Sequence, residues 1–198
     1  MKIVVCPDSF KGSLTAAQAS EAIKEGISSV CPDYHVVTLP LADGGEGTSS
    51  VIASITGGTA IVTDTINAIG ENITATYYII NRGKKKTALI DVAAASGLTL
   101  VSPQRRDVMT ASSYGTGVLI KNAYERGCRD FIIGLGGSAT CDAGTGIMEA
   151  LGPDMPAIAS DISVTLLCDV DNPLYGPKGA ANVFAPQKGA TPRQVALL

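Results

Sequence analysis

The sequence predicts an α/β protein in which a parallel α/β layer is followed by a second α/β part with a mixed sheet. Strand-like and helix-like segments alternate over residues 1–58, which is the order that produces a parallel sheet. From Thr59 the order changes, because three β-rich segments follow one another with turns at 67–71 and 81–85 between them. Successive strands joined by turns favour antiparallel pairing, so we expect a second domain or subdomain after residue 60.

The first part contains two expected strands and two expected helices. The short apolar run at 2–6 is typical of a buried parallel strand. Residues 15–18 (TAAQ) fit a capping box, and apolar residues then keep helical spacing to Val30. A second strand is expected at 36–39, and a second helix at 48–55, ended by two glycines. Because loops at the carboxyl ends of parallel strands gather at one edge, the loops that follow the two strands should be neighbours.

The second part should contain more strands than the first. Expected strands cover residues 61–65, 73–80, 87–92, 131–135 and 163–168, and expected helices cover residues 115–126 and 144–151. Gly127 supplies the stop signal of the longer helix. We find no internal repeat and no low-complexity tract in the sequence.

Composition and charge exclude several classes of protein. The 198 residues are 45% hydrophobic and 17% charged, which is enough for a core of one large or two small domains. A net charge of -3 and the absence of tryptophan argue against nucleic acid as a partner. No apolar run approaches the roughly 20 residues that a membrane helix needs, and the run before Pro7 is too short for a signal peptide. We therefore expect neither a membrane nor a nucleic-acid partner.

The cysteines and the single histidine narrow the chemistry further. Five cysteines without C-x-x-C spacing predict reduced thiols in a cytoplasmic protein. Cys6, Cys128 and Cys168 flank apolar strands, so we expect them in the core. His35 alternates with apolar residues and should point outward from a strand, which argues against a Ser-His-Asp hydrolase.

Four loops that carry acidic residues each follow an expected strand. They cover residues 7–13 (PDSFKGS), 40–48 (PLADGGEGT), 134–142 (GLGGSATCD) and 169–173 (DVDNP). Glycines let a backbone approach a ligand closely, and carboxylates suit a metal ion or a hydroxyl that must lose a proton. We therefore interpret the four loops as one composite site at the carboxyl ends of the strands.

The loop at 134–142 has the features of an anion site. A strand, then glycines and small hydroxyl residues, then a helix, presents backbone N–H groups to an anion such as phosphate. Gly134, Gly136 and Ala139 also satisfy a relaxed dinucleotide fingerprint, which leaves a nicotinamide-dependent oxidoreductase as an alternative. The sequence contains no G-x-x-x-x-G-K-[ST], which excludes a Walker-type nucleotide loop on this chain.

The charged residues of the other loops suggest roles in phosphoryl transfer, which needs positioned phosphates, a neutralising cation and an oriented hydroxyl. Lys11 is the first choice for a cation on the transferred phosphoryl group or on a substrate carboxylate. Asp43 and Glu46 are candidates for magnesium ligation or for a general base, because carboxylates without cysteine or histidine partners favour a hard cation. Lys178 and Lys188, each followed by glycine, could bind phosphate or could be exposed loop lysines.

Seven motifs follow one another along the chain: PDSFKGSL, PLADGGEGT, AAASGL, SYGTG, IGLGGSATCDAG, CDVDNPLYGP and APQKGAT. In kind and order they resemble the motifs of bacterial glycerate kinases of the PDSFK/ADGGEGT type. The resemblance covers nearly the whole chain, and it is specific because several unrelated loops match in order. It implies a kinase that transfers a phosphoryl group from ATP to D-glycerate with Mg²⁺, and small molecules as its partners.

The resemblance also implies an architecture and a set of site residues. A flavodoxin-like parallel layer would be built from both chain ends, with residues 1–60 in it and residues 61–198 in an inserted second α/β domain. Catalytic candidates are Asp8, Lys11, Asp43 and Asp169. Candidates for ATP binding are Gly136, Gly137, Ser138, Thr140 and Asp142. Candidates for substrate binding are Ser9, Phe10, Gly44, Gly45 and Glu46. Metal candidates are Asp43, Asp169 and Asp171, the last two expected to face the site through a bend at a strand end.

The chain departs from the family's pattern in several places. Gly12 stands where an acid is expected, Asp91 where glutamate is usual, and Cys141 where asparagine is usual. The segment 152–161 is much shorter than the family's insert, and the sequence stops at Leu198 where family members continue, so we expect a truncated chain. A non-catalytic fragment that binds small carboxylates is therefore a further alternative. The choice between the 2- and 3-hydroxyl of glycerate, the general base and the oligomeric state stay open.

Overall fold

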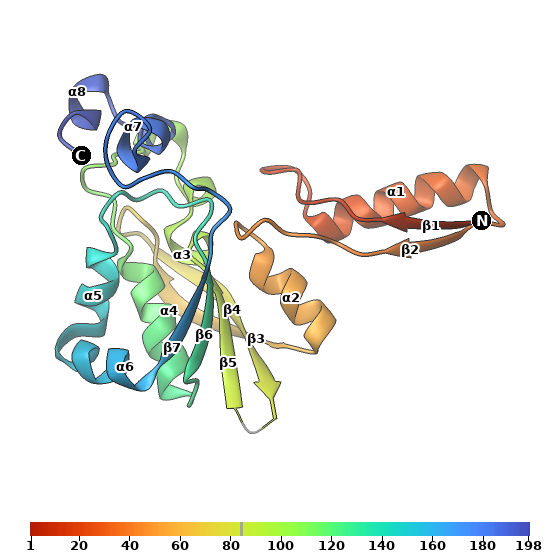
Figure 1. Ribbon diagram of the computed structural model, residues 1–198, viewed down its shortest axis with the longest axis horizontal. Coiled ribbons are helices and arrows are strands. Elements are labelled where there is room, and N and C mark those ends of the chain that lie inside the picture. Colours follow the sequence, from red (N-terminus) through yellow and green to blue (C-terminus); the bar gives the residue numbers. More distant parts are fainter. Residues whose placement is uncertain (84) are drawn as a thin grey trace.

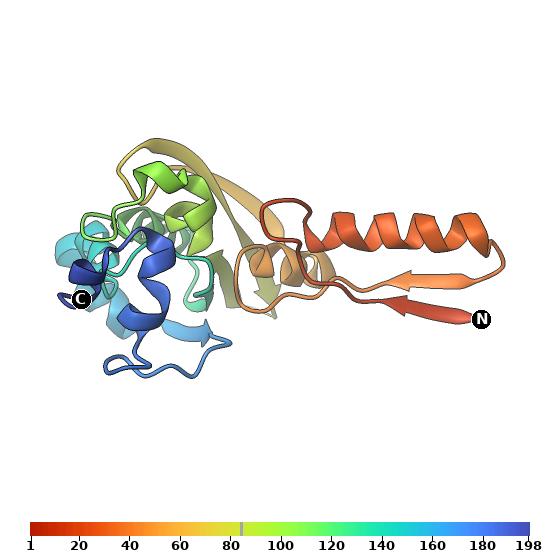
Figure 2. The ribbon, with the colours of Figure 1, turned by 90° about the horizontal axis from the view of Figure 1, so that it is seen from above.

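The computed structural model describes residues 1–83 and 85–198. Figure 1 shows an elongated molecule in which an arm carrying the N-terminus projects from a larger body built around a twisted sheet. We call residues 1–39 the arm, residues 40–47 the link and residues 48–198 the body. Figure 2, seen from above, shows the same separation, with the link as the place where the arm meets the body.

The arm consists of two parallel strands and one helix. Strand β1 (Lys2–Val5) pairs with β2 (His35–Thr38) in the register Lys2↔His35 to Val5↔Thr38. Between them runs helix α1 (Ala16–Val30), whose N-terminus carries the expected capping box between Thr15 and Gln18. The helix covers one face of the two-stranded sheet through its small residues Ala16 and Ala19, which are buried. A two-stranded sheet with so small a core is marginal by itself.

Helix α2 (Thr48–Thr56) follows the link and packs on the body. Its first turn is entered through Gly47 with a φ of 91°, and it ends at Gly57 with a φ of 72°. Both values lie in the left-handed region that favours glycine. Ala53 of α2 is buried against Ile80 and Leu89 of the sheet, so α2 covers one face of the body.

The body is organised around a five-stranded mixed sheet in the order β3-β4-β5-β6-β7. Its strands are β3 (Thr59–Ile66), β4 (Asn72–Arg82), β5 (Lys85–Asp91), β6 (Asp130–Gly134) and β7 (Ser163–Leu167). The first three pair antiparallel, and the last three pair parallel through helical crossovers. The carboxyl ends of β5, β6 and β7 therefore lie at one edge of the sheet.

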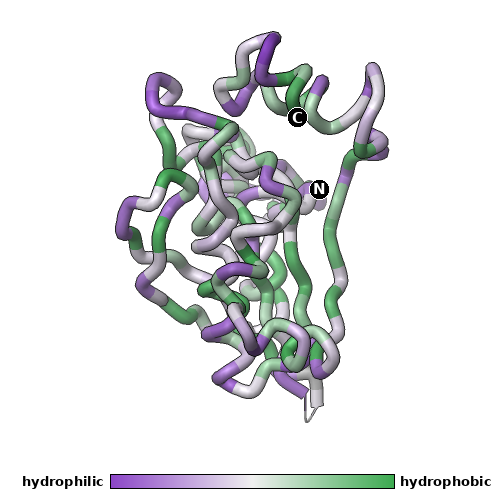
Figure 3. Tube along the Cα trace, turned by 90° about the vertical axis from the view of Figure 1, so that its left-hand side faces the viewer, coloured by the Kyte–Doolittle hydropathy of each residue, from purple (hydrophilic) through white to green (hydrophobic). Residues whose placement is uncertain are grey.

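Helices cover both faces of this sheet. Opposite α2 lie the long helix α4 (Tyr114–Glu125) and three shorter ones: α3 (Ala93–Ser96), α5 (Thr145–Leu151) and α6 (Met155–Asp161). The main core lies between them and the sheet, where Tyr77, Leu119 and Phe131 are almost completely buried. Figure 3 shows hydrophobic residues along the strands and hydrophilic ones at many turns. Beyond β7 the chain forms α7 (Ala180–Phe184) and α8 (Pro192–Val195) over the carboxyl edge of the sheet.

The structure confirms the predicted fold class, a parallel α/β layer plus an α/β unit with a mixed sheet. Every expected strand and helix is present, with ends shifted by at most two residues. The short helices α3, α6, α7 and α8 were not expected, because segments of four to seven residues are too short to show a period. The domain boundary at residue 60 stays a prediction; α2, which precedes it, packs on the body's sheet. Within the described residues, no helix combines the length and the apolar character needed to cross a membrane.

Candidate active site

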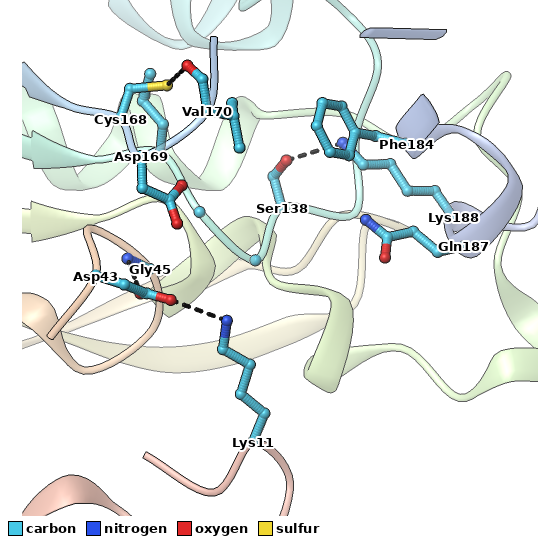
Figure 4. Close-up of a pocket in the computed structure, with 13 residues that line it drawn as sticks. Lys11, Asp43, Gly45, Ser138, Cys168, Asp169, Val170, Phe184, Gln187 and Lys188 are labelled. Atoms are coloured by element: carbon cyan, nitrogen blue, oxygen red, sulfur yellow. Dashed lines mark hydrogen bonds and ion pairs between the residues drawn. The ribbon is translucent and has the colours of Figure 1, made fainter. Parts of the chain in front are cut away.

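A cavity of about 270 Å³ lies at the carboxyl edge of the sheet, where the link meets the body. Its walls come from the arm, the link, the loops after β6 and β7, and the turn after α7 (Figure 4). Of the predicted site residues, seven line it: Lys11, Asp43, Gly45, Gly136, Gly137, Ser138 and Asp169. The structure thus brings the four predicted loops to one place, as their positions after strands suggested.

Glycines of two loops allow this convergence. A Cβ on Gly136 would lie 2.7 Å from the Cα of Gly45, and one on Gly134 would lie 2.7 Å from the carbonyl oxygen of Gly44. The N–H of Gly136 also donates to that carbonyl at 3.1 Å. The link therefore packs backbone to backbone on the loop after β6, and any side chain at Gly136 would push the two apart.

Asp91, at the end of β5, fixes the other side of the link. Its carboxylate accepts hydrogen bonds from the N–H of Gly47 at 2.9 Å, the N–H of Ser49 at 3.0 Å and the hydroxyl of Ser49 at 2.9 Å. The side chain is buried, and burial raises the pKa of this carboxyl above its ordinary range. Asp91 thus anchors the entry of α2 to the sheet and holds the residues next to Asp43 in position.

The cavity's acidic side is formed by Asp43 and Asp169. Asp43 accepts from the N–H of Gly45 at 2.9 Å and from the ammonium of Lys11 at 3.0 Å. The hydrogen bond from Lys11 holds the pKa of Asp43 below its ordinary value, and the same bond raises the pKa of Lys11. Asp169 projects into the same cavity from the end of β7, as Figure 4 shows. An ionised carboxylate, a second acid and an ammonium therefore meet at one end of the cavity.

The opposite end of the cavity is formed by Ser138 and Lys188. Lys188 is only 8% exposed, and its ammonium donates to the hydroxyl of Ser138 at 3.0 Å and to the carbonyl of Thr140 at 2.6 Å. Burial lowers the pKa of Lys188 below its ordinary value. The sequence left Lys188 open between phosphate binding and an exposed loop position; the structure places it in the cavity wall.

Other predicted residues lie elsewhere. Ser9 and Glu46 line a neighbouring cavity of about 300 Å³ beside the arm, where Thr99 donates to Glu46 at 3.3 Å. Phe10 is 56% exposed, and Asp171 is exposed on the loop after β7 rather than turned into the cavity. Asp8 accepts from the N–H of Ser9 at 2.6 Å. The expectation that Asp169 and Asp171 both face this cavity thus holds for Asp169 alone.

Three more predicted residues serve the local structure. Asp142 accepts from both the N–H and the hydroxyl of Ser113 and from the N–H groups of Gly144 and Gly146. Burial raises the pKa of Asp142, but these hydrogen bonds outweigh it and leave the pKa below its ordinary value. Gly44 is buried under the carbonyl of Leu167, and Thr140 offers its carbonyl to Lys188.

No site role was predicted for five wall residues: Leu135, Cys168, Val170, Phe184 and Gln187. All but Phe184 lie within the quoted motifs, and Phe184 ends α7 directly before the APQKGAT motif, so the motifs were visible but these roles were not. The expectation that Cys6 and Cys168 are core residues is wrong, because both lie past the last paired residue of their strands and are exposed. Cys128 is buried, as expected.

Among residues 1–83 and 85–198, no three His, Cys, Asp or Glu side chains are grouped as a ready metal site. Asp43 and Asp169 nevertheless offer oxygen ligands to one polar cavity. Mg²⁺ typically takes only one or two protein carboxylates together with water and substrate phosphates, so this pair fits such an ion.

Comparisons with known proteins agree with the sequence motifs. The sequence model of the glycerate kinase family matches residues 3–157 and 153–198, and the two matches meet at the segment predicted to be shorter than in the family. A glycerate kinase of Haemophilus influenzae is 42% identical over 98% of this chain, and a glycerate 2-kinase of Escherichia coli is 39% identical over 96%. A crystal structure of a protein assigned as glycerate kinase 2 from Salmonella typhimurium LT2 superposes with a TM-score of 0.78 at 38% identity, covering 99% of this chain.

The chain spans only part of these proteins: 58% of the Haemophilus protein, 56% of the Escherichia protein and 59% of the Salmonella chain. Within that part, the motifs, the sequence identity and the fold all indicate the same family. The chain belongs to the glycerate kinase family.

Proposed function

We propose that this protein transfers a phosphoryl group from ATP to D-glycerate, giving phosphoglycerate. The observation that carries the proposal is the convergence of Lys11, Asp43 and Asp169 with the glycine loop at 136–138 in one cavity, in a chain of the glycerate kinase family. Phosphoryl transfer depends mainly on positioning and on electrostatic stabilisation, and this cavity offers cations, carboxylates and backbone N–H groups within a small space.

The catalytic and binding roles are assigned to individual residues. Asp43 stays ionised because Lys11 lowers its pKa, so it can accept a proton from the attacking hydroxyl or bind a metal ion. Lys11 neutralises charge on the transferred group, and Asp8, whose charge acts on Lys11, is proposed as a further catalytic acid beside it. The residues proposed to form the ATP site are Gly136, Gly137, Ser138, Thr140 and Asp142, of which Thr140 acts by holding Lys188 and Asp142 by fixing the loop. The residues proposed to hold glycerate are Ser9, Phe10, Gly44, Gly45 and Glu46.

We further propose that Mg²⁺ accompanies ATP. Asp43 and Asp169 would be its carboxylate ligands, and Asp171 would join them only if the loop after β7 turned toward the cavity. The ion would supply charge neutralisation on the phosphates when bound. The two carboxylates would then be matched by cations and would not repel the substrate's negative charge.

A cytoplasmic protein whose partners are small molecules fits this function. All five cysteines are free, as expected in a reducing compartment. An oxidoreductase has less support, because Gly136, on which the dinucleotide fingerprint depends, is needed for the contact with Gly45. Binding of a reduced nicotinamide cofactor in a fluorescence titration, without turnover of ATP, would favour it.

A coupled ADP-release assay with D-glycerate and Mg-ATP tests the proposal on this chain, with a full-length relative as the positive control. We expect ADP release that depends on D-glycerate and stops after chelation of Mg²⁺. If D-glycerate raises the unfolding temperature of this chain but no ADP forms, the chain by itself is a carboxylate-binding unit and not an enzyme.

A further inference from the structure

Lys188 is the more deeply buried of the two lysines that line the cavity, and its surroundings are unusual for an ammonium group. It lies at the end of the turn Pro186–Lys188, is 8% exposed and donates to the Ser138 hydroxyl and the Thr140 carbonyl. An ammonium has three N–H donors, so one remains for a ligand in the cavity. In Figure 4 its tip lies beside Ser138 on the wall of the cavity.

No carboxylate balances this charge within the part of the chain that the structure describes. Every ion pair found there joins other residues, and Lys188 takes part in none of them. Asp142 lies near enough to favour the charged form of Lys188, but its own carboxylate is already taken by Ser113 and by two backbone N–H groups. A buried charge without a counter-ion is costly, so an anion in the cavity would relieve that cost.

The turn that carries Lys188 is firmly held. The guanidinium of Arg106 donates to the carbonyl of Gln187 at 3.1 Å and to the carbonyls of Val101 and Leu98, both at 3.2 Å. Gly189, which follows Lys188, has a φ of 94° and lies so close to Arg106 that a Cβ would approach its carbonyl oxygen to 2.5 Å. The position of Lys188 is therefore built into the fold rather than being that of a free surface side chain.

The donors around Lys188 suit a phosphoryl group better than a carboxylate. A lysine ammonium is a point charge that can meet any oxygen of a tetrahedral anion, whereas planar bidentate binding of a carboxylate favours arginine. The neighbouring N–H groups of Gly137 and Ser138 donate no hydrogen bond to other described residues. They belong to a glycine turn of the kind that receives phosphate oxygens.

We propose that Lys188, with the Ser138 hydroxyl and the glycine turn at 136–138, binds a phosphoryl group of the nucleotide at the end of the cavity opposite Asp43. This proposal rests on the proposed function but adds to it the residue that recognises the phosphate. It assigns the two ends of the cavity: nucleotide phosphate at Lys188, and the acceptor hydroxyl and metal at Asp43 and Asp169. The transferred phosphoryl group would lie between the two ends, next to Lys11 and the metal ion.

The test measures affinities of this chain by isothermal titration calorimetry with three probes: inorganic phosphate, ADP and D-glycerate. The variants are Lys188→Met, which keeps the length of the side chain without its charge, and Ser138→Ala, which removes one hydroxyl only. Lys24→Met is the matched control, because Lys24 is an exposed lysine of α1 paired with Glu21 at 3.1 Å. Circular dichroism checks that each variant is folded, and Ser138→Ala carries the test if Lys188→Met is not.

We expect Lys188→Met to weaken phosphate and ADP binding by roughly ten- to a hundredfold, the range for hydrogen bonds to charged groups. Ser138→Ala should weaken both by a smaller factor, and D-glycerate affinity should stay within about twofold for both variants. Unchanged phosphate and ADP affinities would overturn the proposal, as would a loss confined to D-glycerate, which would place the substrate carboxylate at Lys188. Failure of the wild type to bind either phosphate or ADP would overturn it too. Phosphate binding that depends on Lys188, in a chain that forms no ADP, would support this site while refuting the proposed function.

Discussion

The arm and the body differ sharply in how much of their chain they bury. In the arm, which the structure describes completely, four residues are buried: Val5, Ala16, Ala19 and Ser20. In the body, a single cluster brings together 14 buried residues, among them Tyr77 and Phe131. Because apolar burial is the main favourable term in folding, the body supplies most of the molecule's stability.

The candidate site is formed by residues of both regions and of the link between them. Lys11 comes from the arm, Asp43 from the link, and Ser138, Asp169 and Lys188 from the body. The least stable part of the molecule thus contributes one of the charged groups on which the chemistry depends. The comparison predicts that mutations in the body act mainly on stability, and that mutations at the junction act mainly on activity.

The largest effect is expected in the core of the body. Phe131→Ala removes a ring that is 1% exposed and should lower the free energy of unfolding by about 3–5 kcal/mol. Val5→Ala, at the most buried apolar position of β1, should cost only about 1–2 kcal/mol. Urea denaturation followed by circular dichroism measures both. Equal losses would contradict the view that the arm contributes little.

At the junction, Lys11→Ala should act on catalysis and hardly on stability. Its side chain is 68% exposed in the pair with Asp43, so the pair adds little to folding. A cation on a transferred phosphoryl group is worth about 2–4 kcal/mol in the transition state, so kcat/KM should fall by roughly 30- to 700-fold. The ADP-release assay on an active protein and thermal unfolding measure the two effects. Lys24→Ala removes a lysine from another exposed pair and should change neither; a parental rate for Lys11→Ala would remove Lys11 from the site.

A substitution at Asp142 tests how much its hydrogen bonds to backbone N–H groups stabilise the loops of the body. Asp142→Ala leaves the N–H groups of Ser113, Gly144 and Gly146 without their acceptor and should cost roughly 1–3 kcal/mol at pH 7. Because the folded pKa lies below the ordinary 3.8, the stabilisation is complete above that pH and is lost as the pH falls through the folded pKa. The difference between wild type and variant should therefore shrink below about pH 4. A difference that stays constant from pH 7 to pH 3 would show that the carboxylate's charge does not matter.

A substitution at Gly136 tests the backbone contact between the link and the body. In Gly136→Ala the new Cβ would lie 2.7 Å from the Cα of Gly45, and neither backbone can rotate away as a side chain could. We expect a loss of about 1–3 kcal/mol in unfolding free energy, as for overpacked sites, together with a clear loss of kcat because Asp43 moves with the link. If both quantities equal those of the wild type, the two loops are not held together by this contact.

The sequence revealed the strands and the main helices because each has a local signature. The capping box at Thr15 and the apolar runs at 2–6 and 131–135 depend only on neighbouring residues, and the structure confirms the cap and both strands. The expected burial of the first strand is wrong, because only Val5 of β1 is buried and Val4 is 54% exposed. The charged loop residues were also recognisable, because parallel strands bring their carboxyl ends to one edge.

What the sequence could not reveal depends on contacts between distant residues. Lys188 meets Ser138 across 50 positions, and Asp91 meets Ser49 across 42, so neither role has a local signature. Asp142 and Asp169 both lie in acidic loops that follow strands. The carboxylate of Asp142 accepts hydrogen bonds from helix N–H groups, whereas Asp169 faces the cavity. Only the packed chain decides which carboxylates remain available for chemistry.

The smallest expected effect concerns whether the arm unfolds independently of the body. Gly26 lies within α1, is exposed, and a Cβ added there meets no atom within 4 Å. Gly26→Ala should therefore stabilise the helix by about 0.5–1 kcal/mol, since glycine is the poorer helix former. If the arm opens separately from the body, hydrogen exchange of the α1 amides should slow by roughly two- to fivefold while that of β6 stays unchanged. Equal slowing in α1 and β6 would show that arm and body unfold as one cooperative unit, in which the arm shares the stability of the body's core.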